Sequence, residues 1–164
     1  MSIFPAKILL ATDGSEEAQL AALTAADLAK STDSELHVVM IFQETAYVHP
    51  YYEVRFPKAA EQLREQAREE IQEVLDEQVE RIRKSGVEVA QAHLKTGEPD
   101  RAIVALAEDL EAGLIVIGSR GLGGMRRPLM GSVSDGVVRH AHCPVMVVRQ
   151  QKAHSAEHEA GFLT

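Results

Sequence analysis

Short apolar runs alternate along the chain with longer segments whose apolar residues recur every three or four positions. The apolar runs, whose lengths predict β-strands, occupy residues 7–11, 36–42, 87–94, 114–117 and 144–149. The segments for which we expect helices are 15–32, 58–85, 98–111 and 132–140. This alternation of strand and helix predicts an α/β fold, in which helices cover both faces of a parallel sheet.

The connection at 43–57 has no clear period and is rich in aromatic residues. Five of the seven aromatic residues lie in or beside it, and they are Phe42, Tyr47, Tyr51, Tyr52 and Phe56. Packing of these rings against the helix that follows is one interpretation. A lid over a ligand and a surface for a partner are the alternatives.

Length, charge and cysteine content restrict the classes of protein. The 164 residues favour one domain, residues 1–150, followed by a polar tail at 151–164 that we expect to be flexible. A net charge of −8 argues against a nucleic-acid partner. The apolar runs are too short to cross a membrane, and the N-terminus lacks the pattern of a signal peptide. With the single cysteine, Cys143, these features predict a cytoplasmic protein.

Ligands of parallel α/β sheets bind at the carboxyl ends of the strands, which here directs attention to the loops after the first and fourth strands. The first loop reads Thr12-Asp13-Gly14-Ser15. Asp13 is a candidate for a ribose hydrogen bond or for an oxygen ligand to phosphate-bound Mg²⁺, and an Asx-turn is the structural alternative. Thr12 and Ser15 are candidate caps of the helix that follows.

The second loop, 118–131, combines glycines with positive charge. Glycines let backbone amides converge on an anion, and Ser132 and Ser134 lie at a helix start, where N–H groups attract phosphate. The window 118–134 holds three arginines and no acidic residue, and the arginines are Arg120, Arg126 and Arg127. A phosphate cradle is the functional interpretation. A surface loop with incidental arginines is the alternative.

The spacing Gly118-x2-Gly121-x9-Gly131-Ser132 resembles the ATP-binding signature of the universal stress protein family. The resemblance extends from about residue 4 to 150. It includes the opening sequence Ile8-Leu9-Leu10-Ala11-Thr12-Asp13-Gly14-Ser15 and the closing sequence Cys143-Pro144-Val145-Met146-Val147-Val148.

The resemblance implies a Rossmann-like, adenine nucleotide alpha hydrolase-like sheet of strand order 3-2-1-4-5, with ATP across the ends of strands one and four. Residues implied to hold phosphate are Gly121, Gly131 and Ser132, with Gly118 at the turn and Val133 adding an amide. Residues implied to lie near the adenosine are Ala11, Asp13 and Ile41. Ala11 departs from the family, in which proline is frequent at this position. The family further implies a homodimer through the Val145–Val148 edge strand.

The function expected from these features is ATP binding, with Mg²⁺, by a homodimeric stress regulator that acts on an unidentified protein partner. Dedicated turnover is not expected, because Asp13 has no second acid or base beside it in the two loops. One alternative is a slow ATPase or an autophosphorylating protein, with Ser119, Ser132 or Ser134 as acceptor. Another is an interaction module that binds no nucleotide. The sequence does not discriminate ATP from AMP.

Overall fold

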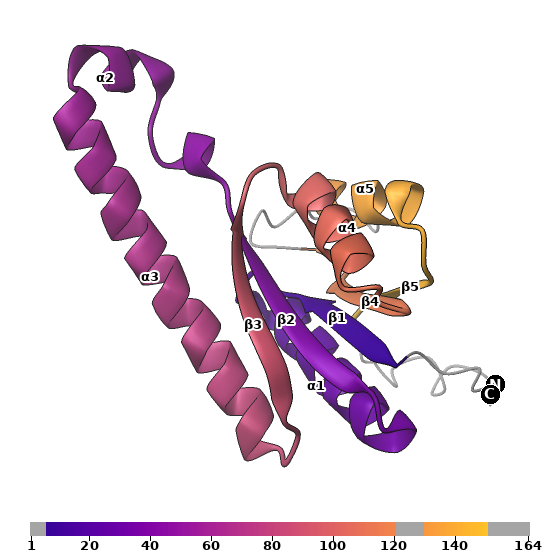
Figure 1. Cartoon of the computed structure of the whole chain (residues 1–164). Coiled ribbons are helices and arrows are strands. Elements are labelled where there is room, and N and C mark those ends of the chain that lie inside the picture. Colours follow the sequence, from indigo (N-terminus) through magenta and orange to yellow (C-terminus); the bar gives the residue numbers. More distant parts are fainter. Residues whose placement is uncertain (1–5, 121–129, 151–164) are drawn as a thin grey trace, which may run out of the picture.

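The chain forms a five-stranded parallel sheet of order β3-β2-β1-β4-β5, as predicted (Figure 1). The computed structural model describes residues 6–120 and 130–150. The strands are β1 (Lys7–Ala11), β2 (Glu35–Phe42), β3 (Val89–Thr96), β4 (Leu114–Gly118) and β5 (Val145–Val148). The helices are α1 (Glu16–Thr32), α2 (Pro50–Arg55), α3 (Pro57–Lys84), α4 (Pro99–Asp109) and α5 (Ser132–His140), with a 3-10 turn, η1 (Glu44–Ala46).

Alternate residues of the central strands point to opposite faces of the sheet and belong to two separate hydrophobic cores. On one face, Ile8 and Leu10 of β1 pack with α1 and α3. On the other, Leu9 and Ala11 pack with α4 and α5. Both faces are therefore buried, which explains why these strands read as continuous apolar runs.

Helix α1 approaches the sheet closely because its buried face consists of alanines. These are Ala18, Ala21, Ala22, Ala25, Ala26 and Ala29. The Ser15 side chain caps the helix by accepting the Ala18 N–H at 3.2 Å. Small side chains and the cap together fix the first turn of α1 against the ends of β1 and β4.

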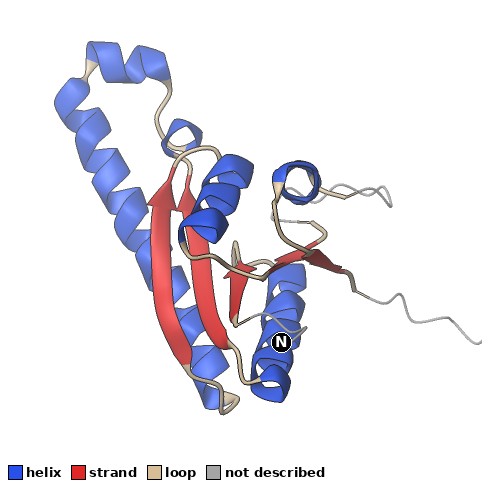
Figure 2. Ribbon diagram, turned by 45° about the vertical axis from the view of Figure 1, so that its right-hand side comes forward, coloured by secondary structure: helices blue, strands red, loops and turns tan. Residues whose placement is uncertain are grey.

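Helix α3 is much longer than the sheet that it covers. Its members of the core, Leu75, Val79 and Ile82, all lie in its C-terminal half. The N-terminal half continues past the ends of the strands and carries α2 at its tip (Figure 2). None of the helices within 6–120 and 130–150 is long and apolar enough to span a membrane.

The connection at 43–57 is more ordered than its sequence pattern predicts, since it contains η1 and α2. Phe42 is buried, but the other four aromatic side chains of the segment are exposed. Their exposed fractions are 48% for Tyr47, 72% for Tyr51, 39% for Tyr52 and 47% for Phe56. Thus α2 packs on α3, and the ring contacts Phe42–Tyr47 and Tyr52–Phe56 leave these four side chains partly exposed.

Candidate functional site

The loop after β1 is held by hydrogen bonds within itself. Asp13 Oδ1 accepts the Ser15 N–H at 2.9 Å, which is the Asx-turn, and Thr12 Oγ1 accepts the Gly14 N–H at 3.3 Å. Thr12 is buried and donates its N–H to Val39 of β2. Asp13 is half-buried, so the same carboxylate lies at the surface of the sheet edge where a ligand would bind.

Ser119 connects the loop after β4 to three other elements. Its N–H donates to the Val148 carbonyl of β5 at 2.8 Å. Its carbonyl accepts the Gly131 N–H at 2.6 Å and the Ser134 hydroxyl at 2.9 Å. Its own hydroxyl donates to Glu17 of α1 at 2.5 Å. The two flanks of the glycine signature are therefore joined at Ser119, which is only 2% exposed.

Two glycines of the signature are positions of close backbone approach. A Cβ on Gly118 would lie 3.1–3.2 Å from the backbone of Glu17 and Ala18 in α1. A Cβ on Gly131 would lie 3.3 Å from the Ser119 carbonyl oxygen. A side chain at either position would therefore require the neighbouring backbone to shift by a few tenths of an ångström, even before a ligand is considered.

The N-terminus of α5 lies beside this junction and has no side-chain cap. Its N-cap is Gly131, and no side chain in the described part of the chain caps it from that position. The backbone N–H groups of Ser132 and Val133 at the start of the helix are therefore candidate anion donors. Ser132 is exposed and Ser134 is buried.

The residues expected near the adenosine lie on neighbouring strands of the same face. Ala11 of β1 is opposite Val39 of β2, and Ile41 is two residues further along β2. Ala11 and Ile41 both contact the core beneath α4 and α5. Ala11 is also opposite Ile117, so Thr12 and Gly118 are adjacent across the ends of β1 and β4.

Glu17 is the site residue that sequence reasoning missed. Its position in the first turn of α1 suggests only a favourable interaction with the helix dipole. Its carboxylate instead accepts the Ser119 hydroxyl and the Arg120 N–H, the latter at 2.7 Å. Ser119 and Arg120 follow Glu17 by 102 and 103 positions in the sequence, and no periodicity predicts a contact over such a separation. The sequence suggests Ser119 only as an acceptor of a phosphoryl group.

Part of the predicted site falls outside the described residues. Gly121, Arg126 and Arg127 lie there, as does the tail at 151–164. The positions that the structure does bring together are the loop after β1, the segment Gly118 to Arg120, and the start of α5.

Comparisons with known proteins agree with this architecture. The sequence model of the Universal stress protein family matches residues 6–149. A universal stress protein of Methanocaldococcus jannaschii is 36% identical over 146 residues, which cover 89% of this chain and 83% of the relative.

Solved structures show the same fold. The universal stress protein UspA of Lactobacillus plantarum superimposes with a TM-score of 0.71 at 24% identity, covering 87% of this chain and 97% of that chain. A universal stress protein of Archaeoglobus fulgidus, solved in complex with dAMP, gives a TM-score of 0.62 at 26% identity. That match covers 90% of this chain and 99% of that chain. On the match over residues 6–149, together with these relatives, this chain belongs to the universal stress protein family.

Proposed function

We propose that this chain binds ATP and acts as a homodimeric, nucleotide-responsive regulator in the cytoplasm, with residues 1–150 as the functional domain. The observation that carries the proposal is the junction at Ser119, where one carbonyl receives the Gly131 N–H and the Ser134 hydroxyl. This junction joins the two flanks of the glycine signature beside the carboxyl end of β1. Phosphates and adenosine would then occupy adjacent parts of one sheet edge.

The proposed contacts follow the two loops. Residues proposed for the adenosine side are Ala11, Thr12, Asp13 and Ile41. Residues proposed for the phosphates are Gly118, Arg120, Gly121, Gly131, Ser132, Val133 and Ser134. Asp13 is the proposed carboxylate for Mg²⁺ bound to the phosphates, because carboxylate oxygens suit this ion.

The start of α5 supports phosphate binding more than the start of α1 does. Ser15 already caps α1 by accepting the Ala18 N–H, whereas Gly131 has no side chain to offer α5. Because Gly131 supplies no capping side chain, the start of α5 offers backbone donors and the positive end of its dipole. The complex of the Archaeoglobus fulgidus relative with dAMP supports an adenine nucleotide as the ligand.

A regulatory role requires that the nucleotide bind one conformation more tightly than another. We propose that the segments 43–57 and 118–131 are those whose conformations ATP selects, and that a partner protein recognises the result. The Val145–Val148 edge strand is the proposed dimer interface.

A slow ATPase or an autophosphorylating protein is the alternative that involves chemistry. Of its three candidate acceptors, Ser132 is exposed, while Ser119 and Ser134 are each only 2% exposed and engaged in hydrogen bonds. Ser132 is therefore the acceptor best placed for such a reaction. Cys143 is a poor nucleophile, because burial raises the pKa of its thiol.

Titration calorimetry with Mg²⁺-ATP, AMP and adenosine tests the proposal, with Ser132→Asp as the diagnostic variant. A carboxylate at the first position of α5 favours the helix, so the fold is retained while a bound phosphate is repelled. We expect binding by the wild type and a loss of at least about ten-fold in ATP affinity in the variant.

Ser31→Asp is the matched control, because it adds the same charge to an exposed serine in the last turn of α1. It should bind ATP as the wild type does. Absence of nucleotide binding by the wild type up to millimolar ATP would reject the proposal and favour the interaction module. Release of inorganic phosphate during the titration would favour the ATPase.

A further inference from the structure

The loop after β4 already holds an anion in this structure, and that anion is a side chain of the protein. Glu17 Oε2 accepts the Ser119 hydroxyl at 2.5 Å and the Arg120 backbone N–H at 2.7 Å. Both distances are in the range of strong hydrogen bonds to a charged acceptor. Glu17 is half-buried, so solvent screens this interaction less than it would at an open surface.

The donors that Glu17 uses are of the kind that phosphates use. The Arg120 amide belongs to the segment between Gly118 and Gly121, which is the first part of the glycine signature. Phosphate-binding loops present backbone N–H groups and hydroxyls to the ligand in the same way. A phosphate and the Glu17 carboxylate would therefore compete for the same amide and hydroxyl.

Carboxylates on the neighbouring segments also oppose an added phosphate, whereas the Arg120 side chain attracts it. Asp13 lies on the neighbouring loop with its carboxylate directed to the Ser15 N–H, and Glu16 precedes Glu17 on α1. Glu16 is exposed and Glu17 is half-buried, so Glu17 has the stronger effect on a nearby ligand. Each additional phosphate negative charge adds repulsion from Glu17.

We infer that Glu17 is a specificity-determining residue, which competes with nucleotide phosphates for the Arg120 N–H and the Ser119 hydroxyl. The inference rests on the proposed nucleotide site. It means that the carboxylate holds Ser119 and Arg120 in place without ligand and penalises ligands according to their phosphate charge. The affinity for ATP is then lower than the cradle alone would allow, whereas the affinity for adenosine is unaffected.

The test compares Glu17→Gln with Glu16→Gln by calorimetry, using ATP and adenosine, first in EDTA and then with Mg²⁺. Glutamine in place of Glu17 keeps an acceptor oxygen for the loop but loses the charge. In EDTA we expect Glu17→Gln to bind ATP about ten-fold more tightly than the wild type does, with adenosine affinity unchanged within about two-fold. Glu16→Gln removes the same charge one residue away and should behave as the wild type.

Three outcomes would overturn the inference. The first is ATP binding that is unchanged or weaker in Glu17→Gln. The second is equal tightening in Glu16→Gln, which would indicate a general charge effect. The third is a parallel gain for adenosine, because adenosine carries no phosphate.

Inorganic tripolyphosphate keeps the inference testable if the wild type binds no nucleotide and the proposed function fails. Calorimetry and the NMR shift of the Arg120 amide both measure the binding of tripolyphosphate alone. This binding should be tighter in Glu17→Gln than in the wild type and in Glu16→Gln. Equal binding by all three proteins would overturn the role of Glu17 independently of any nucleotide.

Discussion

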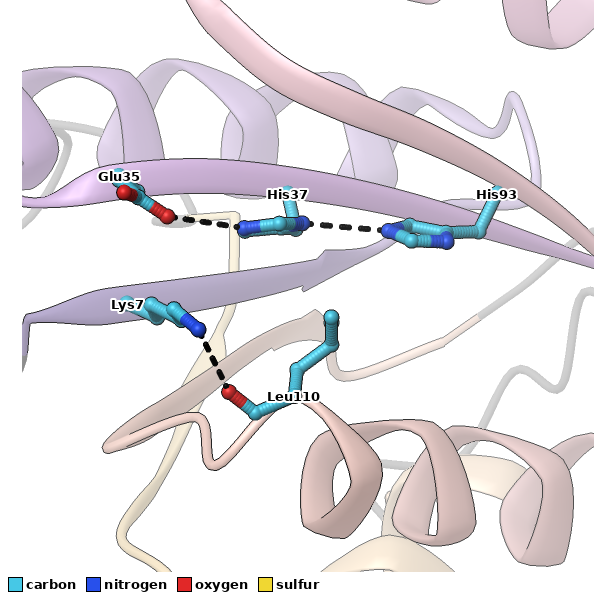
Figure 3. A network of polar contacts seen from close by, with 5 residues as sticks. All are labelled: Lys7, Glu35, His37, His93 and Leu110. Carbon is cyan, nitrogen blue, oxygen red and sulfur yellow. Dashed lines mark hydrogen bonds and ion pairs between the residues drawn. The ribbon is translucent and has the colours of Figure 1, made fainter.

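Two buried histidines lie side by side on adjacent strands, in the layer beneath α4 (Figure 3). His37 Nδ1 lies 3.2 Å from His93 Nε2, and His37 Nε2 lies 3.4 Å from Glu35 Oε2. The rings are stacked, with centroids 5.5 Å apart. A hydrogen bond between the rings needs one nitrogen to donate and the other to accept, so it is lost when both rings are fully protonated.

The environment of His93 makes stability depend on pH. Burial is the main cause that lowers the pKa of His93, and the neighbouring His37 and Lys95 lower it further. Unfolding exposes the imidazole and returns its pKa to about 6.5. The unfolded chain then binds more protons than the folded chain below that pH, so the free energy of unfolding falls as the pH falls through about 6.5.

His93→Gln should reduce this dependence, because the amide still reaches His37 but does not titrate. Urea unfolding at a pH of about 7.5 and of about 5.5, on either side of the unfolded pKa, checks the prediction. We expect the variant to lose less stability than the wild type between these values. An equal loss in His93→Gln and the wild type would contradict the assignment.

At the residue scale, the sequence indicates which positions form turns, caps and close contacts better than it indicates which distant residues they contact. The turn at Asp13, the cap at Ser15 and the glycine at position 118 follow from local rules, and the structure has all three. The Glu17 contact depends on how α1 lies against β4. That arrangement is a product of packing between distant segments, which local rules do not encode.

At the scale of elements, α4 and α5 pack closely because α5 has a glycine at their contact. A Cβ on Gly136 would lie 2.8 Å from the Cβ and 2.9 Å from the Cγ of Asp100, and it would also overlap an Oδ atom of that residue. Such distances require one helix or side chain to shift. The helix spacing on this face of the sheet therefore depends on a single missing methyl group.

Gly136→Ala should destabilise the protein by about 1–3 kcal/mol. The sign is diagnostic, because the same change inside an exposed helix stabilises by about 1 kcal/mol. The midpoint of urea unfolding measures the effect. Adding Asp100→Ala removes two of the overlapping atoms and should recover part of the lost stability. A double-mutant cycle that shows no coupling energy between the two substitutions would contradict the contact.

The elements themselves were largely predictable, and the exceptions have a physical cause. The alternation of strands and helices and the buried face of α1 follow from patterns long enough to show a period, whereas the strand order was implied by the family resemblance. Helix α2 spans 6 residues, too few to display one, and its sequence mixes exposed aromatic and charged side chains. β3 begins at Val89 and not at residue 87, because pairing with β2, including a register shift between Leu36 and His37, decides its limits.

At the scale of the whole molecule, the two edges of the sheet differ in character. The exposed or half-buried positions of β3 include Gln91 and Lys95, whereas β5 is the uniformly apolar Val145–Val148. Within the described residues, β5 pairs with β4 alone. The Pro144 carbonyl accepts the Ile115 N–H of β4, and the Val148 carbonyl accepts the Ser119 N–H. Backbone groups alternate in direction along a strand, so the N–H and carbonyl groups of Val145 and Val147 point away from β4.

Val147→Pro tests whether this edge joins two copies. Proline removes an outward-pointing N–H, so pairing with β4 is retained while pairing with a second copy is lost. Sedimentation should give a dimer for the wild type and a monomer for the variant, with unchanged circular dichroism. Val147→Ala keeps the N–H and should remain dimeric. A dimeric Val147→Pro protein would place the interface elsewhere.

The projection of α2 and the first half of α3 beyond the sheet has a spectroscopic consequence. The chain has three tyrosines and no tryptophan, and the tyrosines are Tyr47, Tyr51 and Tyr52. All three belong to the connection between β2 and α3, outside the two cores. Intrinsic ultraviolet emission therefore reports on this connection, through Tyr51 and Tyr52 of α2 and through Tyr47, whose ring centroid lies 5.4 Å from that of Phe42 at the end of β2. A change in tyrosine emission that precedes the loss of circular dichroism would therefore indicate local opening of this connection before global unfolding, in the unmodified protein and without an added dye or label.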